Sequence, residues 1–461
     1  MAQSIQFLGA ARTVTGSKHL ITHNGKKILI DCGLFQGGQE LSARNWLDFE
    51  FDPATLDLVI LTHAHMDHIG MLPNLVKAGY RGPIICTAAT LGLARISLPD
   101  SGRIQEEDAR HANKHGYSRH SPALPLYTEK DAYACLKQFQ KVHYYDFRDL
   151  PGGGTWRFLP AGHILGSAFI EIYFENGERI LMGGDLGRFD TPIIKDPTTV
   201  EFAEYLVIES TYGDRSHAKE NIRHRLATII TQAVKDGTAI LTPSFSIGRT
   251  QELLYHIHQM QDQKRIPRIP IFVDSPMAVS STQVYRQALE EHDDEMKAEL
   301  DMAHEPLEPE NLTMVRDREQ SKALNVHPGP MMVIAGSGMC NGGRIVHHLL
   351  HRLSSENTLV LFTGYQAEGT LGRRLIEGAD VVTIHGREVE VRARVDKLNS
   401  LSAHCDADEM MRWLGGFKVA PKKTFIVHGE IHAQEALQAR IQTELGWETE
   451  IPYQADVFDL E

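Results

Sequence analysis

The sequence predicts an α/β fold in which a doubly wound parallel unit interrupts a domain built on a mixed sheet. Two observations support this prediction. In the N-terminal part, apolar runs flank a turn centred on Asn176-Gly177, which favours a hairpin and therefore antiparallel strand pairs. From about Thr211 onward, helical stretches alternate with short apolar strands, a pattern typical of a doubly wound parallel sheet.

The expected elements follow from apolar runs and their periodicity. In the first region, strands are expected at 5–8, 27–31, 58–62, 84–86, 169–174 and 179–182. In the second region, helices are expected at 220–236, 248–261, near 277–291 and near 343–352, and strands at 238–241, 270–273, 331–335 and 359–362. The acidic, helical stretch 290–310 predicts a solvated face or a connector and not a site.

Residue types that bind metals occur on both sides of the second region, so we expect that region to be an insertion. The chain would leave the first domain, build the α/β unit, and return to complete the first domain's site. The predicted boundaries give a first domain of residues 1–209 and 396–461 and an inserted domain of residues 210–395. A length of 461 residues also exceeds one typical core.

The composition is that of a soluble globular protein, with 42% hydrophobic and 23% charged residues. No run reaches the ~18 apolar residues of a membrane span, and the N-terminus lacks the pattern of a secretion signal. The five cysteines lack CxxC spacing, which fits reduced thiols. We therefore expect a cytoplasmic protein without membrane association. Cys405 adjoins His404, which leaves a role in metal binding open.

The net charge of −13 limits how this protein could hold an anionic polymer. Lys and Arg number 47 against 60 Asp and Glu, so bulk charge does not favour polyanions. A nucleic-acid substrate would have to be held by metal ions and a local basic groove. The 24 histidines suit a metalloenzyme.

The most informative segment is His63-Ala64-His65-Met66-Asp67-His68, which follows an apolar run. Imidazole and carboxylate groups together suit zinc or a similar divalent ion. Alternate residues at a strand end point the same way, so His63 and His65 can share one ion. Asp67 and His68 can then hold a second ion.

Further ligands follow other predicted strands. His163 would join His63 and His65 on one zinc ion, His428 would join Asp67 and His68 on the other, and Asp185 would bridge the two. Manganese could serve in the same site. A hydroxide shared by two ions suits in-line attack on a phosphodiester. Asp31 is expected to orient a ligating histidine, and the alternative for Asp31 is a turn residue.

These residues resemble the metallo-β-lactamase hydrolases, and more narrowly the β-CASP branch of nucleases, over nearly the whole chain. Asp31, the segment 63–68, His163 and Asp185 match the four motifs of the superfamily, and Glu209, His404 and His428 match motifs A, B and C of the branch. The segments 243–253, 336–344 and 364–373 agree with the branch as well. The resemblance implies an αββα sandwich with an inserted β-CASP domain.

The resemblance also implies roles for three residues. His404 would protonate the leaving oxygen, a task that suits imidazole, and Glu209 would favour its protonated form. His428 at motif C is typical of the RNA-processing branches. The chain resembles compact bacterial members without added RNA-binding modules, and a homodimer is compatible with the family.

Several residues are candidates for contacts with substrate in a cleft between the two domains. Ser402 could donate its hydroxyl to a phosphate, and Ser337 and Gly338 could offer backbone N–H groups at a helix N-terminus. Arg249 could bind phosphate through its planar fork. For each, a packing or surface role is the alternative. The same holds for Arg344, Arg373 and Arg374 as phosphate ligands and for Tyr212 and Tyr365 as stacking residues.

The leading hypothesis is a zinc-dependent ribonuclease with two zinc ions, acting as an endonuclease, a 5′–3′ exonuclease or both. A hydrolase of small thioesters or lactones is the second hypothesis, because the segment 63–68 alone names only the superfamily. The third is a non-catalytic partner that binds RNA or a protein. Every predicted ligand position is filled, which favours an enzyme.

Overall fold

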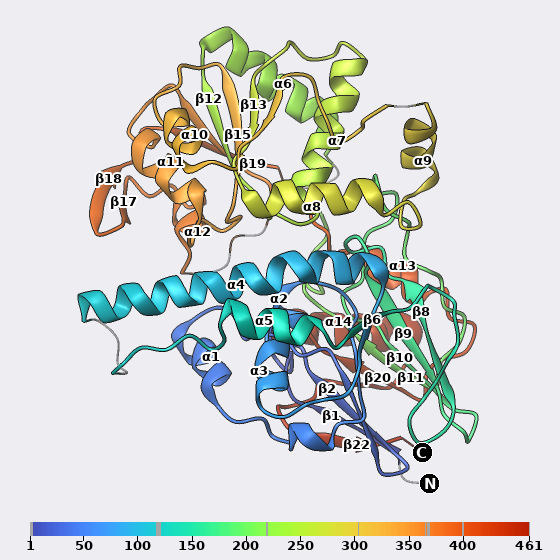
Figure 1. Cartoon of the computed structure of the whole chain (residues 1–461). Helices are drawn as coiled ribbons and strands as arrows, with labels where there is room; N and C mark the ends of the chain where they lie inside the picture. Colours follow the sequence, from blue (N-terminus) through green and yellow to red (C-terminus); the bar gives the residue numbers. More distant parts are fainter. Residues whose placement is uncertain are drawn as a thin grey trace. The chain divides into compact units, whose positions relative to one another are not determined.

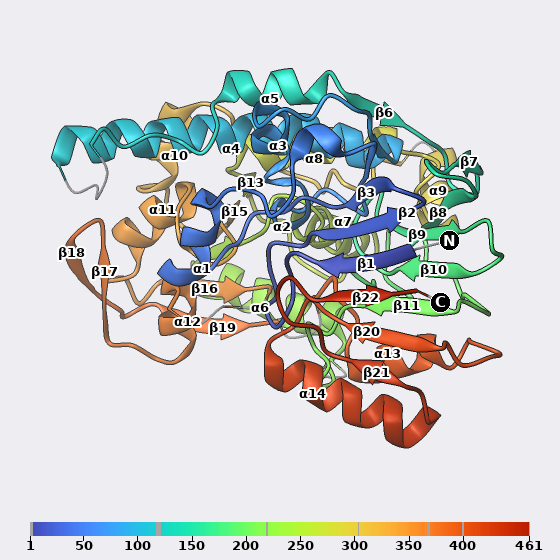
Figure 2. The same cartoon turned by 90° about the horizontal axis from the view of Figure 1, so that it is seen from below.

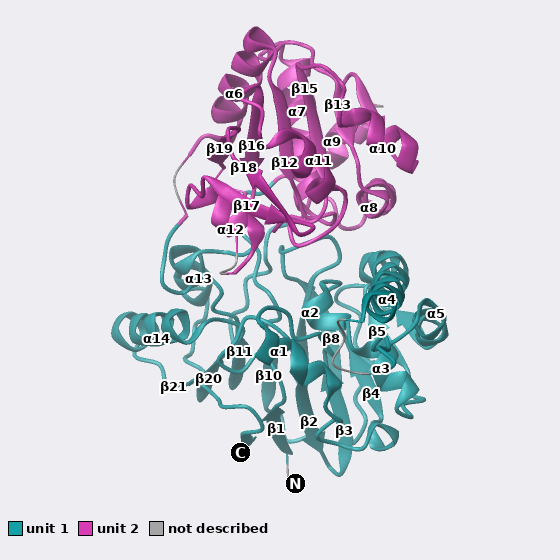
Figure 3. Cartoon of the chain, turned by 90° about the vertical axis from the view of Figure 1, so that its left-hand side faces the viewer, with its two compact units in different colours: residues 1–191, 195–216, 404–461 teal, residues 192–194, 217–403 magenta. Residues whose placement is uncertain are grey.

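The computed structural model describes residues 3–116, 121–217, 220–302, 304–364, 366, 369–398 and 401–460. The chain divides into two compact units (Figure 3). The first contains residues 1–191, 195–216 and 404–461, and the second contains residues 192–194 and 217–403. Figure 1 traces the elements of each unit along the chain.

The first sheet of the first unit has the strand order β22-β1-β2-β3-β4-β5-β6. Strands β1 to β3 and β22 pair antiparallel, whereas β3 to β6 run parallel. Figure 2 shows β22 beside β1, so the two ends of the chain lie in one sheet. The strands are β1 (Gln3–Phe7), β2 (His19–His23), β3 (Lys26–Ile30), β4 (Leu58–Ile60), β5 (Ile84–Cys86), β6 (Phe139–Lys141) and β22 (Val457–Asp459).

The second sheet has the order β21-β20-β11-β10-β9-β8-β7. The pairs β7/β8, β8/β9 and β9/β10 are antiparallel, and the turn at Asn176-Gly177 connects β9 to β10 as the hairpin prediction requires. Strands β10, β11, β20 and β21 run parallel. The strands are β7 (Arg148–Asp149), β8 (Thr155–Pro160), β9 (Ala168–Tyr173), β10 (Arg179–Met182), β11 (Tyr205–Ile208), β20 (Lys423–Ile426) and β21 (Thr449–Glu450).

An apolar core lies between the two sheets, with Ile5 and Ile28 from one sheet and Phe158 and Ile170 from the other. A second core joins the outer face of the second sheet to two helices, α13 and α14. Figure 3 shows helices outside both sheets, so the predicted αββα sandwich is confirmed. The helices are α1 (Gln39–Ala43), α2 (Met66–Ile69), α3 (Leu72–Lys77), α4 (Ala88–His115), α5 (Glu129–Leu136), α13 (Ala407–Leu414) and α14 (Ile431–Arg440), with the 3₁₀ helices η1 (Arg44–Trp46) and η2 (Pro53–Thr55) and the π-helix η3 (Ile441–Leu445).

The second unit is the predicted doubly wound α/β domain. Its sheet has the order β14-β13-β15-β12-β16-β19 and every pair in it is parallel. The strands are β12 (Ala239–Pro243), β13 (Ile271–Val273), β14 (Leu312–Met314), β15 (Met331–Ala335), β16 (Thr358–Phe362) and β19 (Arg394–Lys397). The helices are α6 (Ile222–Asp236), α7 (Arg249–Asp262), α8 (Pro276–Gln287), α9 (Asp294–Asp301), α10 (Arg318–Leu324), α11 (Arg344–Arg352) and α12 (Leu371–Ile376). A separate hairpin pairs β17 (Val381–Ile384) with β18 (Arg387–Glu390).

Two apolar clusters cover the two faces of this parallel sheet. Ile240 and Ile334 belong to one cluster, and their strand neighbours Leu241 and Val333 belong to the other. Because successive residues of a strand point to opposite faces, both faces are buried, as a parallel sheet between helices requires. Among the described helices, none is long and apolar enough to cross a membrane.

Candidate metal centre

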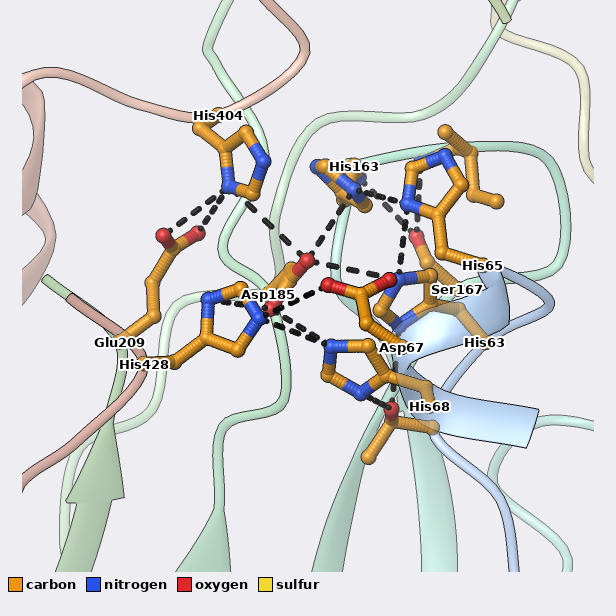
Figure 4. A network of polar contacts seen from close by, with 12 residues as sticks. His63, His65, Asp67, His68, His163, Ser167, Asp185, Glu209, His404 and His428 are labelled. Atoms are coloured by element: carbon orange, nitrogen blue, oxygen red, sulfur yellow. Dashed lines mark hydrogen bonds and ion pairs between the residues drawn. The ribbon is translucent and has the colours of Figure 1, made fainter. Parts of the chain in front are cut away.

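The histidines and aspartates of the candidate site come from the carboxyl ends of strands. In the second sheet, β8, β10 and β20 point the same way, and His163, Asp185 and His428 follow them. In the first sheet, β4 ends just before His63. The fold therefore gathers at one edge residues that lie far apart in the sequence (Figure 4).

The segment after β4 turns directly into a helix. His65 is the residue before α2, so Asp67 lies in the first helical turn and His68 in the last. His63 and His68 are both buried. All four candidate ligands of the segment belong to the clustered groups of potential ligand atoms, His63 and His65 to one group and Asp67 and His68 to another.

Three imidazoles and one carboxylate form a first group. Nδ1 of His65 lies 3.0 Å from Nε2 of His63 and 3.1 Å from Nε2 of His163. Oδ2 of Asp185 lies 3.4 Å from Nε2 of both His63 and His163. The potential ligand atoms of these four residues all lie within 4.8 Å of one another.

A second group consists of Asp67, His68 and His428. Nε2 of His428 lies 3.2 Å from Nε2 of His68 and 3.3 Å from Oδ2 of Asp67. Oδ1 of Asp185 faces this group, at 3.3 Å from Nε2 of His68. The two oxygens of Asp185 therefore face different groups of ligands, as Figure 4 shows.

The pKa values of the first group favour neutral imidazoles. Burial, followed by the charge of His68, lowers the pKa of His63 to about 3. Burial also lowers the pKa of His65 to about 4 and that of His163 well below its usual range. A neutral imidazole carries the lone pair that a metal ligand needs.

In the second group, the nearby carboxylates together have a larger effect on the pKa values of the histidines than burial has. Burial opposes charge on His68 and His428, but Asp185 and other carboxylates raise the pKa of both histidines. In turn, despite burial, the surrounding histidines lower the pKa values of Asp67 and Asp185. Positive charge is therefore stabilised at this group, and a divalent cation can supply it.

The donor set fits a metal ion. The pKa values leave the three rings of the first group neutral, and their nitrogens converge at 3.0 and 3.1 Å from each other. Oδ1 of Asp185 is buried and has no hydrogen-bond partner. Buried polar atoms usually have partners, and a cation among nitrogen and carboxylate ligands would satisfy these atoms.

Asp31 lies behind the second group and orients it. Its Oδ2 lies 2.8 Å from Nδ1 of His68, and its Oδ1 accepts a hydrogen bond of 2.8 Å from the backbone N–H of Thr62. The hydroxyl of Thr62 donates to Oδ2 of Asp31 at 2.7 Å and also lies 3.1 Å from Nδ1 of His63. Asp31 adopts a positive φ of 59°. This geometry supports a positioning role over a simple turn.

Two hydroxyl residues of the site were not anticipated from the sequence. Thr62 connects Asp31 to the ligand histidines, and the Ser167 hydroxyl accepts a hydrogen bond from the backbone N–H of His163 at 3.0 Å. The position of Thr62, directly before His63, was the only available signal. Ser167 lies in a turn before β9, and its sequence context carries no such signal.

His404 and Glu209 form a pair beside the first group. Both oxygens of Glu209 lie 3.0 Å from Nδ1 of His404, and Oε1 also accepts from the backbone N–H of Leu186. Burial alone would lower the pKa of His404, but the Glu209 carboxylate raises it to about 9. His404 is 21% exposed, whereas Glu209 is fully buried. The Glu209 carboxylate thus favours the protonated form of this partly exposed imidazole.

The loop that carries His163 and the loop that carries Asp185 approach each other closely at two glycines. A Cβ atom at Gly187 would lie 1.8 Å from the carbonyl oxygen of Gly162. Gly162 itself has a φ of +68°, which side chains disfavour. The loops that carry His163 and Asp185 can therefore approach closely only because these positions lack side chains.

Some of the residues predicted to contact substrate already use their polar groups within the protein. Arg249 is 8% exposed and its guanidinium pairs with Glu252 at 2.6 Å. The backbone N–H of Ser337 donates to the carbonyl of Gly342, so this amide is already used within its turn. Gly338 and the half-buried Ser402 remain predictions as substrate contacts.

The other arginine and tyrosine candidates have structural partners. Arg344 donates to Asp274 and to two main-chain carbonyls, and Arg373 and Arg374 contact Glu377 and the carbonyl of Val381. Tyr212 is buried, and its ring and that of His404 lie in a T-shaped arrangement with a centroid distance of 6.2 Å. Tyr365 lies outside the described residues.

Cys405 belongs to the apolar core under α13 and is fully buried. Burial, together with the charge of Glu209, raises the pKa of its thiol well above the usual range. It is not part of any described group of residues that could hold a metal ion. A metal-binding role for Cys405 therefore has no support in this geometry.

Comparisons with known families agree with this architecture. Residues 14–90 match the metallo-beta-lactamase superfamily and residues 250–375 match the Beta-Casp domain. Residues 388–452 match the Zn-dependent metallo-hydrolase RNA specificity domain. A crystal structure of a protein of unknown function from Enterococcus faecalis V583 aligns over 100% of both chains, with a TM-score of 0.57 and 12% identity, which supports the fold alone.

Among curated proteins, Ribonuclease TTHA0252 of Thermus thermophilus is 39% identical over 424 residues, which cover 92% of each chain. Transcription termination factor FttA of Methanocaldococcus jannaschii is 30% identical over 92% of this chain and 67% of its own. An RNase J-like protein of the same archaeon is 27% identical over 99% of both chains. The chain therefore belongs to the β-CASP ribonuclease family of the metallo-β-lactamase superfamily, whose members are zinc-dependent metallo-hydrolases.

Proposed function

We propose that this protein hydrolyses RNA phosphodiester bonds with two zinc ions. The observation that carries the proposal is the position of Asp185, whose two oxygens face two separate groups of ligands. Similarity to Ribonuclease TTHA0252 and to the RNA specificity domain supports RNA as the substrate. His428 at motif C agrees with this choice.

Under this proposal, one ion would be held by His63, His65 and His163 and the other by Asp67, His68 and His428, with Asp185 shared. Two ions in such a site supply a water molecule of lowered pKa as the nucleophile and positive charge to stabilise the phosphorus centre. Asp31 and Thr62 keep His68 and His63 in the ligating orientation.

The proton for the leaving oxygen would come from His404. Its Nδ1 lies 3.0 Å from both oxygens of Glu209, which leaves Nε2 as the proton donor. The carboxylate of Glu209 also raises the pKa of His404, so the imidazole is charged at neutral pH. A general acid in this protonation state protonates an alkoxide as the P–O bond breaks.

The test is cleavage of one RNA oligonucleotide, labelled at either end, and of its DNA counterpart, with zinc or manganese. Wild type is compared with Asp67→Ala and His404→Ala. We expect RNA cleavage that is lost in Asp67→Ala and falls by 10²–10⁴-fold in His404→Ala, with zinc content reduced only in Asp67→Ala. The label pattern separates endonuclease from exonuclease action. Absence of RNA cleavage by a protein that carries two zinc ions would overturn the proposal.

A further inference from the structure

Phe245 is an exposed aromatic residue at an unusual place in the second unit. It lies in the turn between β12 and α7 and is 39% exposed, although both of its sequence neighbours, Ser244 and Ser246, are more buried. A single exposed apolar side chain is normally unremarkable on a protein surface. Phe245 differs because its ring and its backbone are both held in place.

Two glycines lie beside the ring of Phe245. A Cβ atom at Gly338 would lie 2.6 Å from the Phe245 ring, and a Cβ atom at Gly364 would lie 3.5 Å from it. The Cδ2–Cε2 edge of the ring thus faces two different loops at positions that carry no side chain. Neither glycine has a positive φ, so the need for glycine at position 338 arises from the ring and not from the local backbone conformation.

A buried amide ties the two glycines together. Nε2 of Gln366 donates to the carbonyl oxygens of Gly338 at 2.9 Å and Gly364 at 3.2 Å, and Gln366 is 4% exposed. The side chain of Gln366 therefore fixes the distance between the two backbone segments that support the ring of Phe245. The surroundings of the Phe245 ring are therefore held in place by hydrogen bonds of a buried side chain.

The backbone of Phe245 is fixed as well. Its carbonyl oxygen accepts hydrogen bonds from the hydroxyl of Thr250 at 2.8 Å, from the backbone N–H of Thr250 at 3.3 Å and from the hydroxyl of Ser244 at 3.3 Å. Thr250 and Ser244 are both buried. Ring and backbone are therefore organised before any ligand arrives, which lowers the entropy cost of binding.

Phe245 lies in the loop at the carboxyl end of β12, next to a point where the strand order of the sheet reverses. From β12 the chain crosses to β13 on one side of the sheet, whereas from β16 it continues to β19 on the other side. Strands β12 and β16 are neighbours, so their carboxyl ends flank a point where the strand order reverses. Open α/β sheets bind ligands in the crevice at such points, and Phe245 and Gly364 come from these two strand ends.

We propose that Phe245 is a stacking platform for one base of single-stranded RNA. The inference rests on the proposed ribonuclease function and extends it with a residue that holds the substrate. An aromatic face suits any base, because every base has a π face. A flat platform of this kind would bind RNA largely independently of sequence, and its contribution does not depend on the chain's net charge of −13.

The experiment measures binding separately from cleavage. The probe is a single-stranded RNA that has phosphorothioate linkages and carries 2-aminopurine. It is titrated into the full chain loaded with zinc. Fluorescence anisotropy and 2-aminopurine fluorescence are recorded. The variants are Phe245→Ala, Phe245→Leu and Phe245→Trp. Tyr133→Ala is the matched control, since Tyr133 is 54% exposed on α5 of the first unit.

We expect Phe245→Ala and Phe245→Leu to bind RNA about tenfold more weakly, as for loss of one stacked base, and to lose part of the 2-aminopurine quenching. Phe245→Trp and Tyr133→Ala should bind as wild type does. Gly338→Ala, whose Cβ would displace the ring, should weaken binding like Phe245→Ala. Zinc content and melting temperature of each variant report whether the fold is intact.

Two results would overturn the inference. If Phe245→Ala binds RNA as tightly as wild type, the platform does not exist, and the ribonuclease proposal is unaffected. If Phe245→Leu binds RNA with wild-type affinity while Phe245→Ala binds it more weakly, the contact is a general apolar one and not base stacking. Wild type that neither binds nor cleaves RNA would instead remove the proposed function itself.

Discussion

Replacing Asp31 by asparagine tests how the metal centre is oriented. The two side chains have the same shape, and asparagine tolerates the φ of +59° at this position. The amide oxygen can still accept from the backbone N–H of Thr62, but an NH₂ group replaces the oxygen that lies 2.8 Å from Nδ1 of His68. Nδ1 of His68 would then have to accept a hydrogen bond where it now donates one.

This change moves the imidazole proton of His68 from Nδ1 to Nε2. Nε2 is the nitrogen that lies 3.2 Å from His428 and 3.3 Å from Asp185, so the lone pair needed for a metal ion would be lost. Mutation of such orienting partners typically costs 10–100-fold in metal affinity, which corresponds to about 1.4–2.8 kcal/mol. We expect Asp31→Asn to weaken binding of one zinc ion by this factor.

Competition against a chromogenic zinc chelator measures the affinity of each ion. Asp57→Asn is the matched control, because Asp57 precedes β4 and its carboxylate accepts from Lys26 and from the backbone N–H of Lys27. That variant should bind zinc as wild type does. If Asp31→Asn retains wild-type affinity for both zinc ions, the argument from the tautomer of His68 is wrong.

Three further predictions concern other parts of the chain. Glu209→Gln should lower the pKa of His404, which Glu209 now raises to about 9. The alkaline limb of the pH profile of kcat should therefore shift to lower pH. An unchanged profile would contradict this. Cys405→Ala should keep the wild-type zinc content, and the native thiol should resist alkylation at neutral pH, as mass spectrometry can check. Asp274→Asn should destabilise the second unit by about 3–5 kcal/mol, because Asp274 is fully buried and its carboxylate pairs with the guanidinium of Arg344 at 2.6 Å; denaturant unfolding that matches wild type would argue against it.

Much of the fold could be predicted because it depends on local patterns. The Asn176-Gly177 turn and the alternation of helices and strands after Thr211 correspond to the hairpin β9/β10 and to the parallel sheet of the second unit. Long helix α4 (Ala88–His115) was not predicted. It contains Pro99, and its buried residues lie almost entirely between Ala89 and Gly102. The second half of the helix therefore offers little apolar periodicity from which it could be predicted.

The sequence by itself determined the residue types of the metal centre and the strands that precede them, because a ligand's chemistry and its position after an apolar run are local properties. Only the tertiary structure decided which ligands meet. The closeness of His68 and His428, the two directions of the Asp185 oxygens and the partners of Asp31 depend on strand order in two sheets. The same holds for Phe245, since the two glycines beside one edge of its ring come from the loops after β15 and β16. Contacts between distant segments follow from how strands pair, and no local pattern encodes that pairing.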